Sequence, residues 1–171
     1  ESQGHLNPSV LWRALYLNDK RIFQNKEEEP ELNFSVDLML DASASRLNVQ
    51  ESIASQAYVI ASALQQCHIP VQIYSFCSLR GYTALRLFCS YEETNTKERI
   101  FDYYAAGWNR DGLALRGASY LMKSSPCKNR ILIVFTDANP NDDKRIPANP
   151  QEKRPFGEDY SEEAAVKDTA A

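Results

Sequence analysis

Residues 33–45 read Asn-Phe-Ser-Val-Asp-Leu-Met-Leu-Asp-Ala-Ser-Ala-Ser, and this stretch decides the fold class. The apolar residues Phe34, Val36, Leu38, Met39 and Leu40 leave only Asp37 out of place among the last residues, which predicts a strand buried on both faces. Such continuously apolar strands are typical of parallel sheets that are covered by helices. The polar sequence that begins at Asp41 follows the strand directly, so any function of this segment is expected at the strand's carboxyl end.

Further helices and strands are expected to alternate after this strand. Apolar residues at helical spacing, and short apolar runs bounded by turn residues, separate the two kinds of element. The expected helices are 48–67, about 97–106, about 112–122 and one that starts at Ser161, and the expected strands are 69–76, 84–89 and 131–135. The run Ile-Leu-Ile-Val-Phe at 131–135 predicts a central strand. The alternation predicts a doubly wound, mostly parallel open α/β sheet with helices on both faces.

The chain is expected to have two parts. Residues 1–32 form an N-terminal helical extension, whose helix follows Asn7 and Pro8, and an acidic linker that ends at Pro30. Residues 33–171 form the main α/β domain. Neither end carries an ordinary start or stop signal, so we expect a segment of a longer protein in which the C-terminal part of this domain is incomplete.

Composition excludes several classes of function. The chain has 171 residues, of which 43% are hydrophobic, and a net charge of −4, which repels nucleic acid and anionic membranes. No apolar run approaches the roughly 18 residues of a membrane span, and no secretory signal pattern opens the sequence. Four widely spaced cysteines without a C-x-x-C pair are expected to be reduced and buried. We therefore expect a cytoplasmic protein with no nucleic-acid partner and no membrane insertion.

Acidic residues end two of the expected strands. Asp41 follows the first strand and Asp137 follows the strand at 131–135, so both carboxylates are expected at one edge of the sheet. Two carboxylates in a crevice repel each other unless a cation lies between them. Ser43 and Ser45 can add neutral hydroxyl oxygens, which are ligands that a hard cation accepts. The pattern predicts a divalent cation site for Mg²⁺, with Mn²⁺ or Ca²⁺ as alternatives.

The pattern D-x-S-x-S after one strand and T-D after a later one resembles the metal-ion-dependent adhesion site (MIDAS) of the von Willebrand factor A (VWA) domain family. The resemblance covers roughly residues 33–171. It implies a doubly wound sheet, a bound Mg²⁺ and a binding activity in which the ion's open position accepts a carboxylate from a partner protein. It also implies that Asp41, Ser43, Ser45 and Asp137 are metal-site residues. Family members often have a glycine where this chain has Ala138, which leaves the geometry of that loop open.

A third loop narrows the resemblance. The family usually has a threonine where this chain has Asp111, within Asn-Arg-Asp-Gly-Leu-Ala-Leu at 109–115. That aspartate, together with the segment at 11–23, resembles bacterial VWA domains of nitric-oxide-reductase activation proteins and of the cobaltochelatase T subunit. This similarity implies Asp111 as a further metal ligand, and an adaptor that works with a MoxR- or chelatase-type AAA+ ATPase to activate or metallate a target enzyme. Three carboxylates around a dication leave a net charge of −1, which predicts weaker attraction for an acidic partner.

Other interpretations of the same residues stay open. Asp41, Ser43, Ser45 and Asp111 could each cap a helix, in a degenerate domain that binds no metal. The fold class also includes Mg²⁺-dependent phosphotransferases and hydrolases, in which Asp41 or Ser43 would be the nucleophile. The sequence has no glycine-rich phosphate loop, no G-x-S-x-G motif and no histidine near the serines. We therefore expect a binding module and not an enzyme.

Overall fold

The chain divides into two compact units, residues Glu1–Leu32 and Asn33–Ala171. The computed structural model describes residues 5–6, 8, 11–17, 23–24, 33–93, 97–148, 157, 159–160 and 162–170. In the first unit, strands β1 (His5–Leu6) and β2 (Phe23–Gln24) pair antiparallel, and α1 spans Leu11–Leu17. The expected acidic linker before Pro30 lies outside the described residues. None of the described helices is long and apolar enough to cross a membrane.

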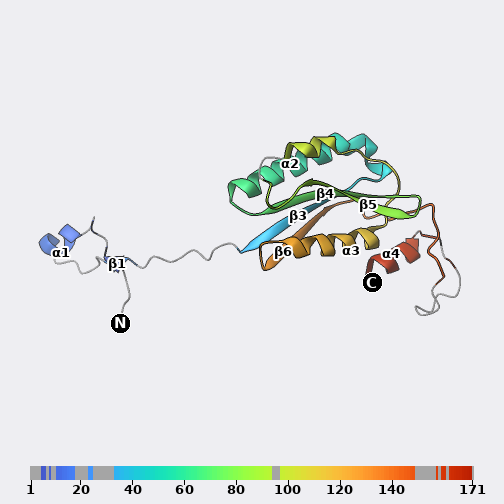
Figure 1. Ribbon diagram of the computed structural model, residues 1–171. Helices are drawn as coiled ribbons and strands as arrows, with labels where there is room; N and C mark the ends of the chain where they lie inside the picture. Colours follow the sequence, from blue (N-terminus) through green and yellow to red (C-terminus); the bar gives the residue numbers. More distant parts are fainter. Residues whose placement is uncertain are drawn as a thin grey trace. The chain divides into compact units, whose positions relative to one another are not determined.

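The second unit is an open sheet of four described strands with helices on both faces (Figure 1). Its strand order is β5-β4-β3-β6; β3 is parallel to both β4 and β6, and β4 pairs antiparallel with β5. The sheet is therefore mostly parallel, and the predicted fold class is confirmed. The elements are β3 (Phe34–Asp41), η2 (Ala44–Val49), α2 (Gln50–Gln66), β4 (Val71–Leu79), β5 (Tyr82–Cys89), η3 (Lys97–Asp102), α3 (Asp111–Leu121), η4 (Met122–Ser124), β6 (Asn129–Phe135) and α4 (Glu162–Ala170).

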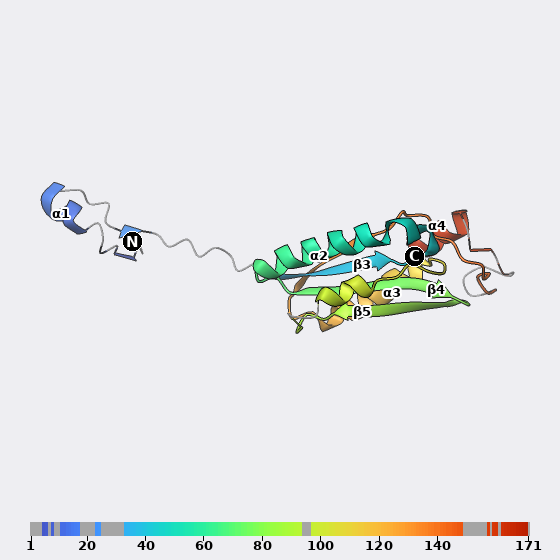
Figure 2. The same ribbon diagram turned by 90° about the horizontal axis from the view of Figure 1, so that it is seen from above.

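Each face of the sheet has its own hydrophobic core because successive side chains of a strand point to opposite faces. Leu38 and Leu40 of β3 pack with the helix α2, which contributes Ile53 and a row of buried alanines. Met39 packs on the opposite face in a cluster that contains residues of α3. Figure 2 shows this layering from above, with α2 lying lengthwise along β3. The alanines of α2 and α3 allow both helices to approach the sheet closely.

Three expectations are wrong: the position of one strand, the type of one helix and the burial of the cysteines. β6 was expected to be central, but it lies at the edge of the described sheet, and Ile131 is 44% exposed. Residues 97–102 form a short 3-10 helix in place of an α-helix over 97–106. Among the cysteines only Cys89 is buried, and Cys67 is exposed, although no disulfide is present.

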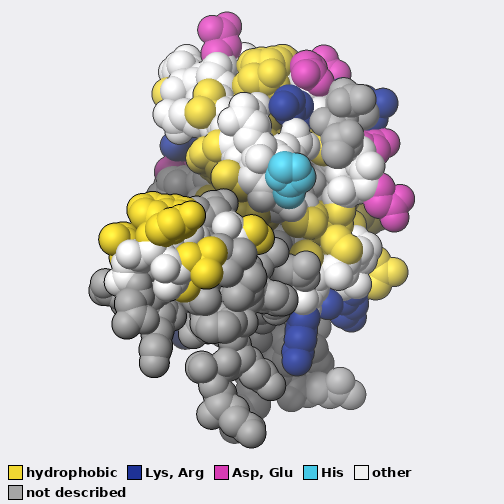
Figure 3. All heavy atoms as spheres, turned by 90° about the vertical axis from the view of Figure 1, so that its left-hand side faces the viewer, with side chains coloured by type: hydrophobic (Ala, Val, Ile, Leu, Met, Phe, Trp, Pro, Cys, Tyr) yellow, Lys and Arg dark blue, Asp and Glu magenta, His cyan; other side chains and the backbone are white. Residues whose placement is uncertain are grey.

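The carboxyl ends of the parallel strands bring three polar loops to one end of the sheet. Asp41 is the last residue of β3, residues 136–137 follow β6 directly, and α3 begins beside them at Asp111. This is the end toward which the β3 arrow points in Figure 1. The other end of this unit carries acidic and basic side chains scattered among apolar ones (Figure 3). The candidate site therefore lies at the carboxyl end of the parallel strands.

Candidate metal site at the carboxyl edge of the sheet

The loop after β3 folds back so that its polar groups hydrogen bond one another. The backbone N–H of Ser43 donates to Asp41 Oδ1 at 2.8 Å, and the hydroxyls of Ser43 and Ser45 lie 2.9 Å apart. Ser45 Oγ donates to Asp137 Oδ2 at 3.0 Å, which joins this loop to the one after β6. Ser43 is the N-cap residue of η2, but its side chain makes no capping hydrogen bond. The hydroxyls are thus turned toward the carboxylates.

The loop after β6 holds Asp41 from the other side. Thr136 Oγ1 donates to Asp41 Oδ2 at 3.2 Å and accepts from the backbone N–H of Ala138 at 3.0 Å. Ala138 has a φ of 54°, a left-handed conformation that glycine adopts with less strain. The loop therefore keeps the turn that a glycine would favour. Thr136 was quoted in the sequence motif but not predicted as a site residue.

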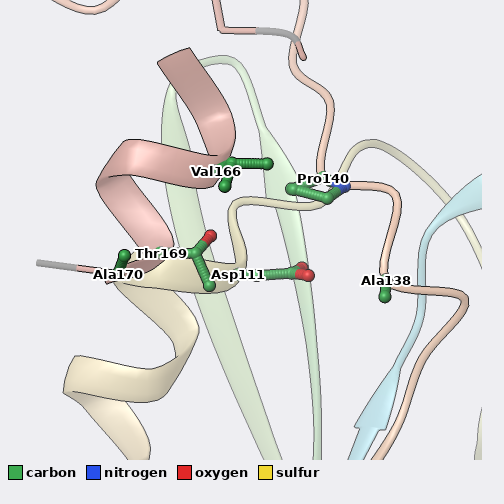
Figure 4. Close-up of a pocket in the computed structure, with 6 residues that line it drawn as sticks. All are labelled: Asp111, Ala138, Pro140, Val166, Thr169 and Ala170. Carbon is green, nitrogen blue, oxygen red and sulfur yellow. The ribbon is translucent and has the colours of Figure 1, made fainter. Parts of the chain in front are cut away.

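Asp111 comes from a third loop and faces the same region. It is the first residue of α3 and only 8% exposed, while Arg110 is the N-cap residue, so the side chain of Asp111 does not cap the helix. Asn109 Nδ2 donates to Asp111 Oδ1 at 3.4 Å. In Figure 4 the carboxylate points across a cavity of about 240 Å³ toward the loop that carries Ala138. α4 contributes Val166, Thr169 and Ala170 to the lining of this cavity.

Neighbouring carboxylates add to the raised pKa values of Asp111 and Asp41. Burial raises the pKa of Asp111 to about 6, with smaller contributions from the charges of Asp41 and Asp137. Burial also raises the pKa of Asp41; hydrogen bonds from Ser43 oppose the rise and the charge of Asp137 adds to it. Without a cation, the folded chain therefore resists the full ionisation of Asp41 and Asp111.

Arg46 is a site residue that the sequence interpretation missed. Its guanidinium donates to Asp137 Oδ2 and, through Nε, to Ser45 Oγ at 3.3 Å. The side chains of Arg46 and Asp137 are both 23% exposed. Arg46 thus places a positive charge beside Asp137, which the predicted sum of −1 for three carboxylates and a dication did not include. The weaker attraction for an acidic partner stays a prediction.

The donor set fits a hard cation only if the hydroxyls take part. In the described part of the chain, no three His, Cys, Asp or Glu side chains converge closely enough to hold a metal ion. The serine pair supplies two further oxygens beside Asp137, and every polar donor in the predicted set is oxygen. All-oxygen sets that leave places for water are those that Mg²⁺ accepts, whereas Zn²⁺ prefers nitrogen and sulfur ligands.

Solved structures provide an independent view of the fold. The vWF domain of the type V pili tip protein Mfa5 from Porphyromonas gingivalis matches 63% of this chain and 38% of its own, with a TM-score of 0.50 and 12% identity. The chain has a VWA-like fold. The pilus adhesin SpaC from Lactobacillus rhamnosus GG, in its open conformation, matches 70% of the chain and 17% of its own, with a TM-score of 0.50 and 15% identity. At these identities the likeness of the VWA-like chain to both proteins concerns the fold alone.

Sequence comparison adds one similar protein. The uncharacterized protein PA0525 of Pseudomonas aeruginosa is 28% identical over 116 residues, which are 66% of this chain. The VWA-like chain spans 18% of that protein's length. No protein-family model matches the chain.

Proposed function

We propose that this VWA-like domain is a metal-dependent protein-interaction module. Asp41, Ser43, Ser45, Asp111 and Asp137 would hold one divalent cation, Mg²⁺ in the first place, with Mn²⁺ or Ca²⁺ as substitutes. The cation would supply a positive centre with an open position, and that position would accept a carboxylate from a partner protein. Binding, not catalysis, is the proposed activity.

One observation carries this proposal: Asp41 and Asp137, from two loops, are joined by hydrogen bonds to a pair of serines at one end of the sheet, and their charges reach Asp111 of a third loop. The Ser43–Ser45–Asp137 chain and the Thr136–Asp41 bond link the first two loops. The raised pKa of Asp111 reflects both burial and the other two charges. Ionising a group of neighbouring acids is costly without a cation. A dication among them would offset that cost, which gives a physical reason for their placement.

We further propose that the module is an adaptor in bacteria, working with a MoxR- or chelatase-type AAA+ ATPase in activation or metallation of a target enzyme. This part follows from the resemblance of the Asp111 loop to the bacterial subset. The VWA-like fold shared with a pilus adhesin supports a binding role in general. Dependence on ATP would place the adaptor in the cytoplasm.

Metal-dependent stabilisation tests the first part of the proposal. A ligand that binds only the folded state stabilises it by about 1.4 kcal/mol at ten times its dissociation constant, and this amounts to roughly 3–6 °C for a chain of this size. We expect a rise of this order in the melting temperature in millimolar Mg²⁺ or Mn²⁺. Asp41→Ala should abolish the rise because it removes the carboxylate that both loops surround.

Asp143→Ala is the matched control. Asp143 lies in the loop after Asp137, but its carboxylate is 45% exposed and lies near Lys144, outside the candidate site. Its removal should leave the metal response unchanged. If the wild-type protein shows no shift with either ion, the domain is a structural VWA-like unit without metal. If the shift persists in Asp41→Ala, the ion binds elsewhere.

A further inference from the structure

A second cavity lies directly beside the candidate metal site. It has a volume of about 330 Å³ and is lined by residues 43–45, residues 107–109, Asn139 and Asn141. The serines that belong to the predicted metal set therefore also form one wall of this cavity. A group that occupied it would lie next to anything bound at the cation.

Backbone contacts hold the opposite wall in place. Trp108 exchanges two backbone hydrogen bonds with Ser78, of 2.7 and 2.9 Å, and the N–H of Ala44 donates to the carbonyl of Gly107 at 2.9 Å. Gly107 has a φ of 81°, and a Cβ at this position would come within 2.7 Å of the Leu79 side chain. Only glycine fits at this position. Together with the hydrogen bonds to Ala44 and Ser78, it holds the backbone of Trp108 close to the serine loop. Its side chain nevertheless remains 40% exposed.

The chemistry of this cavity differs from that of its neighbour. None of its lining residues is acidic or basic, although the chain has a net charge of −4 and Asp111 lines the other cavity. Trp108 contributes a large apolar ring, and Asn139 and Asn141, both exposed, contribute amide groups. The volume is at the lower end of the range for small-molecule sites, which suits one large side chain. A neutral group is favoured over a charged one, because none of the lining residues supplies an opposite charge.

We propose that this cavity receives a large apolar or aromatic side chain that flanks, in the partner protein, the acidic residue bound at the metal. The inference rests on the proposed function, because it assigns the neighbouring position to that partner's carboxylate. Trp108 is then a specificity-determining residue. It packs on the partner's side chain without touching the cation, while the metal-site residues hold the ion.

Short peptides test this inference. Three blocked, fluorescently labelled peptides carry one Asp flanked on both sides by Gly, Leu or Trp, and their affinities are measured by fluorescence anisotropy in millimolar Mg²⁺. We expect the Trp- and Leu-flanked peptides to bind about tenfold more tightly than the Gly-flanked one, as for a well-packed apolar anchor. Excess EDTA should remove binding of all three, since the carboxylate requires the ion.

Variants separate the cavity from the metal. Trp108→Ala should reduce the preference to about one while Mn²⁺ affinity, measured by electron paramagnetic resonance, stays unchanged. Asn141→Phe, at an exposed position, should do the same by filling the cavity from its other side. Tyr120→Ala is the control, because this exposed aromatic residue of α3 does not line the cavity.

The outcomes distinguish the two proposals. If Mn²⁺ binds but the three peptides bind with equal affinity, or no peptide binds, the cavity does not receive an apolar side chain, and the proposed metal site is still supported. A preference that persists in both Trp108→Ala and Asn141→Phe also overturns the inference. If no metal binds the wild-type protein, the proposed function itself fails, and the inference fails with it.

Discussion

Asp37 and Asp111 are both buried carboxylates, but their surroundings differ. Asp37 lies in the middle of β3 with no exposed surface, and its nearest partners are hydroxyls: Tyr91 donates to its Oδ2. Asp111 lies at the carboxyl edge of the sheet, faces a cavity and feels the charges of two other carboxylates. Burial is the largest cause of the raised pKa in both residues.

The difference separates a structural acid from a candidate ligand. Burial raises the pKa of Asp37, and no other acid is among the causes of that rise, so its burial bears on the stability of the fold alone. The pKa of Asp111 is raised by burial and also by the charges of Asp41 and Asp137, so a single cation would offset the repulsion between these carboxylates. A raised pKa therefore points to a functional site only where the charges of neighbouring acids contribute to it, as they do at Asp111. The predictions that follow separate the two cases.

The largest effect is expected from Asp111→Asn in metal-free protein. The unfolded chain loses the proton of this residue near pH 3.8, but the folded chain keeps it up to about pH 6, so stability falls as the pH rises between these values. Asparagine avoids that loss. Urea unfolding in EDTA should show a gain in the free energy of unfolding of about 3 kcal/mol at pH 7.5 and less than about 1 kcal/mol at pH 4.

Mg²⁺ supplies the control for Asp111→Asn. The wild-type protein should gain stability when the ion is added and the variant should gain less, so that the difference between them shrinks or reverses. An asparagine variant that is less stable than the wild type at pH 7.5 in EDTA would show that the Asp111 carboxylate is not strained by its neighbours.

A smaller effect, without metal dependence, is expected from Asp37→Asn. The Tyr74 hydroxyl lies beside Asp37, but its geometry falls short of a hydrogen bond, and Asp37 Oδ1 has no partner among the described residues. An amide Nδ2 can donate to that hydroxyl, and the neutral group removes a buried charge. We expect the variant to be more stable by on the order of 1 kcal/mol at pH 7.5, equally in EDTA and in Mg²⁺.

Asp37→Leu provides the contrast. It removes the acceptor for the Tyr91 hydroxyl and should lower the free energy of unfolding by about 1–3 kcal/mol. The same urea titrations measure both substitutions. A gain for Asp37→Asn that changed with Mg²⁺ would contradict the division between the two acids, because it would couple Asp37 to the cation.

The fold was predictable because its signals are local. The apolar run before Asp41 and the spacing in α2 report directly on burial, and the order of strands and helices then restricts the sheet to a doubly wound form. The position of β6 was not predictable from its own sequence. An apolar run shows that a strand can be buried, but which strands flank it depends on pairing with residues far away in the chain.

The candidate site shows the same limit. Asp41, Ser43, Ser45 and Asp137 follow strands whose carboxyl ends must meet, so their approach could be predicted from topology. Arg46 reaches Asp137 by its side-chain conformation, and Trp108 reaches its place through backbone contacts with Ser78 and the anchoring of Gly107. The spacing of residues along the sequence indicates the position of neither Arg46 nor Trp108. An arginine directly after the serine motif could have suggested a cation near the acids.

Arg46 gives the smallest effect expected and refines the contrast between the two acids. Its guanidinium lies on Asp137 and Ser45, which are predicted metal ligands, whereas Arg130 acts on Asp37 only as a lesser charge. A bound cation must compete with Arg46 for the same oxygens. Since a partly exposed ion pair contributes up to about 1 kcal/mol, Arg46→Gln should raise Mn²⁺ affinity by up to about fivefold.

Arg86→Gln is the matched control for Arg46→Gln because it removes a guanidinium from an exposed pair with Asp102 that is outside the candidate site. Mn²⁺ titrations followed by electron paramagnetic resonance compare both variants with the wild type. Affinity that rises for Arg46→Gln alone means that the guanidinium holds the place of the cation in the metal-free protein. Affinity that falls instead means that Arg46 helps to position Asp137 for the ion, and in that case the charge balance of the site includes an arginine that stays in place when metal binds.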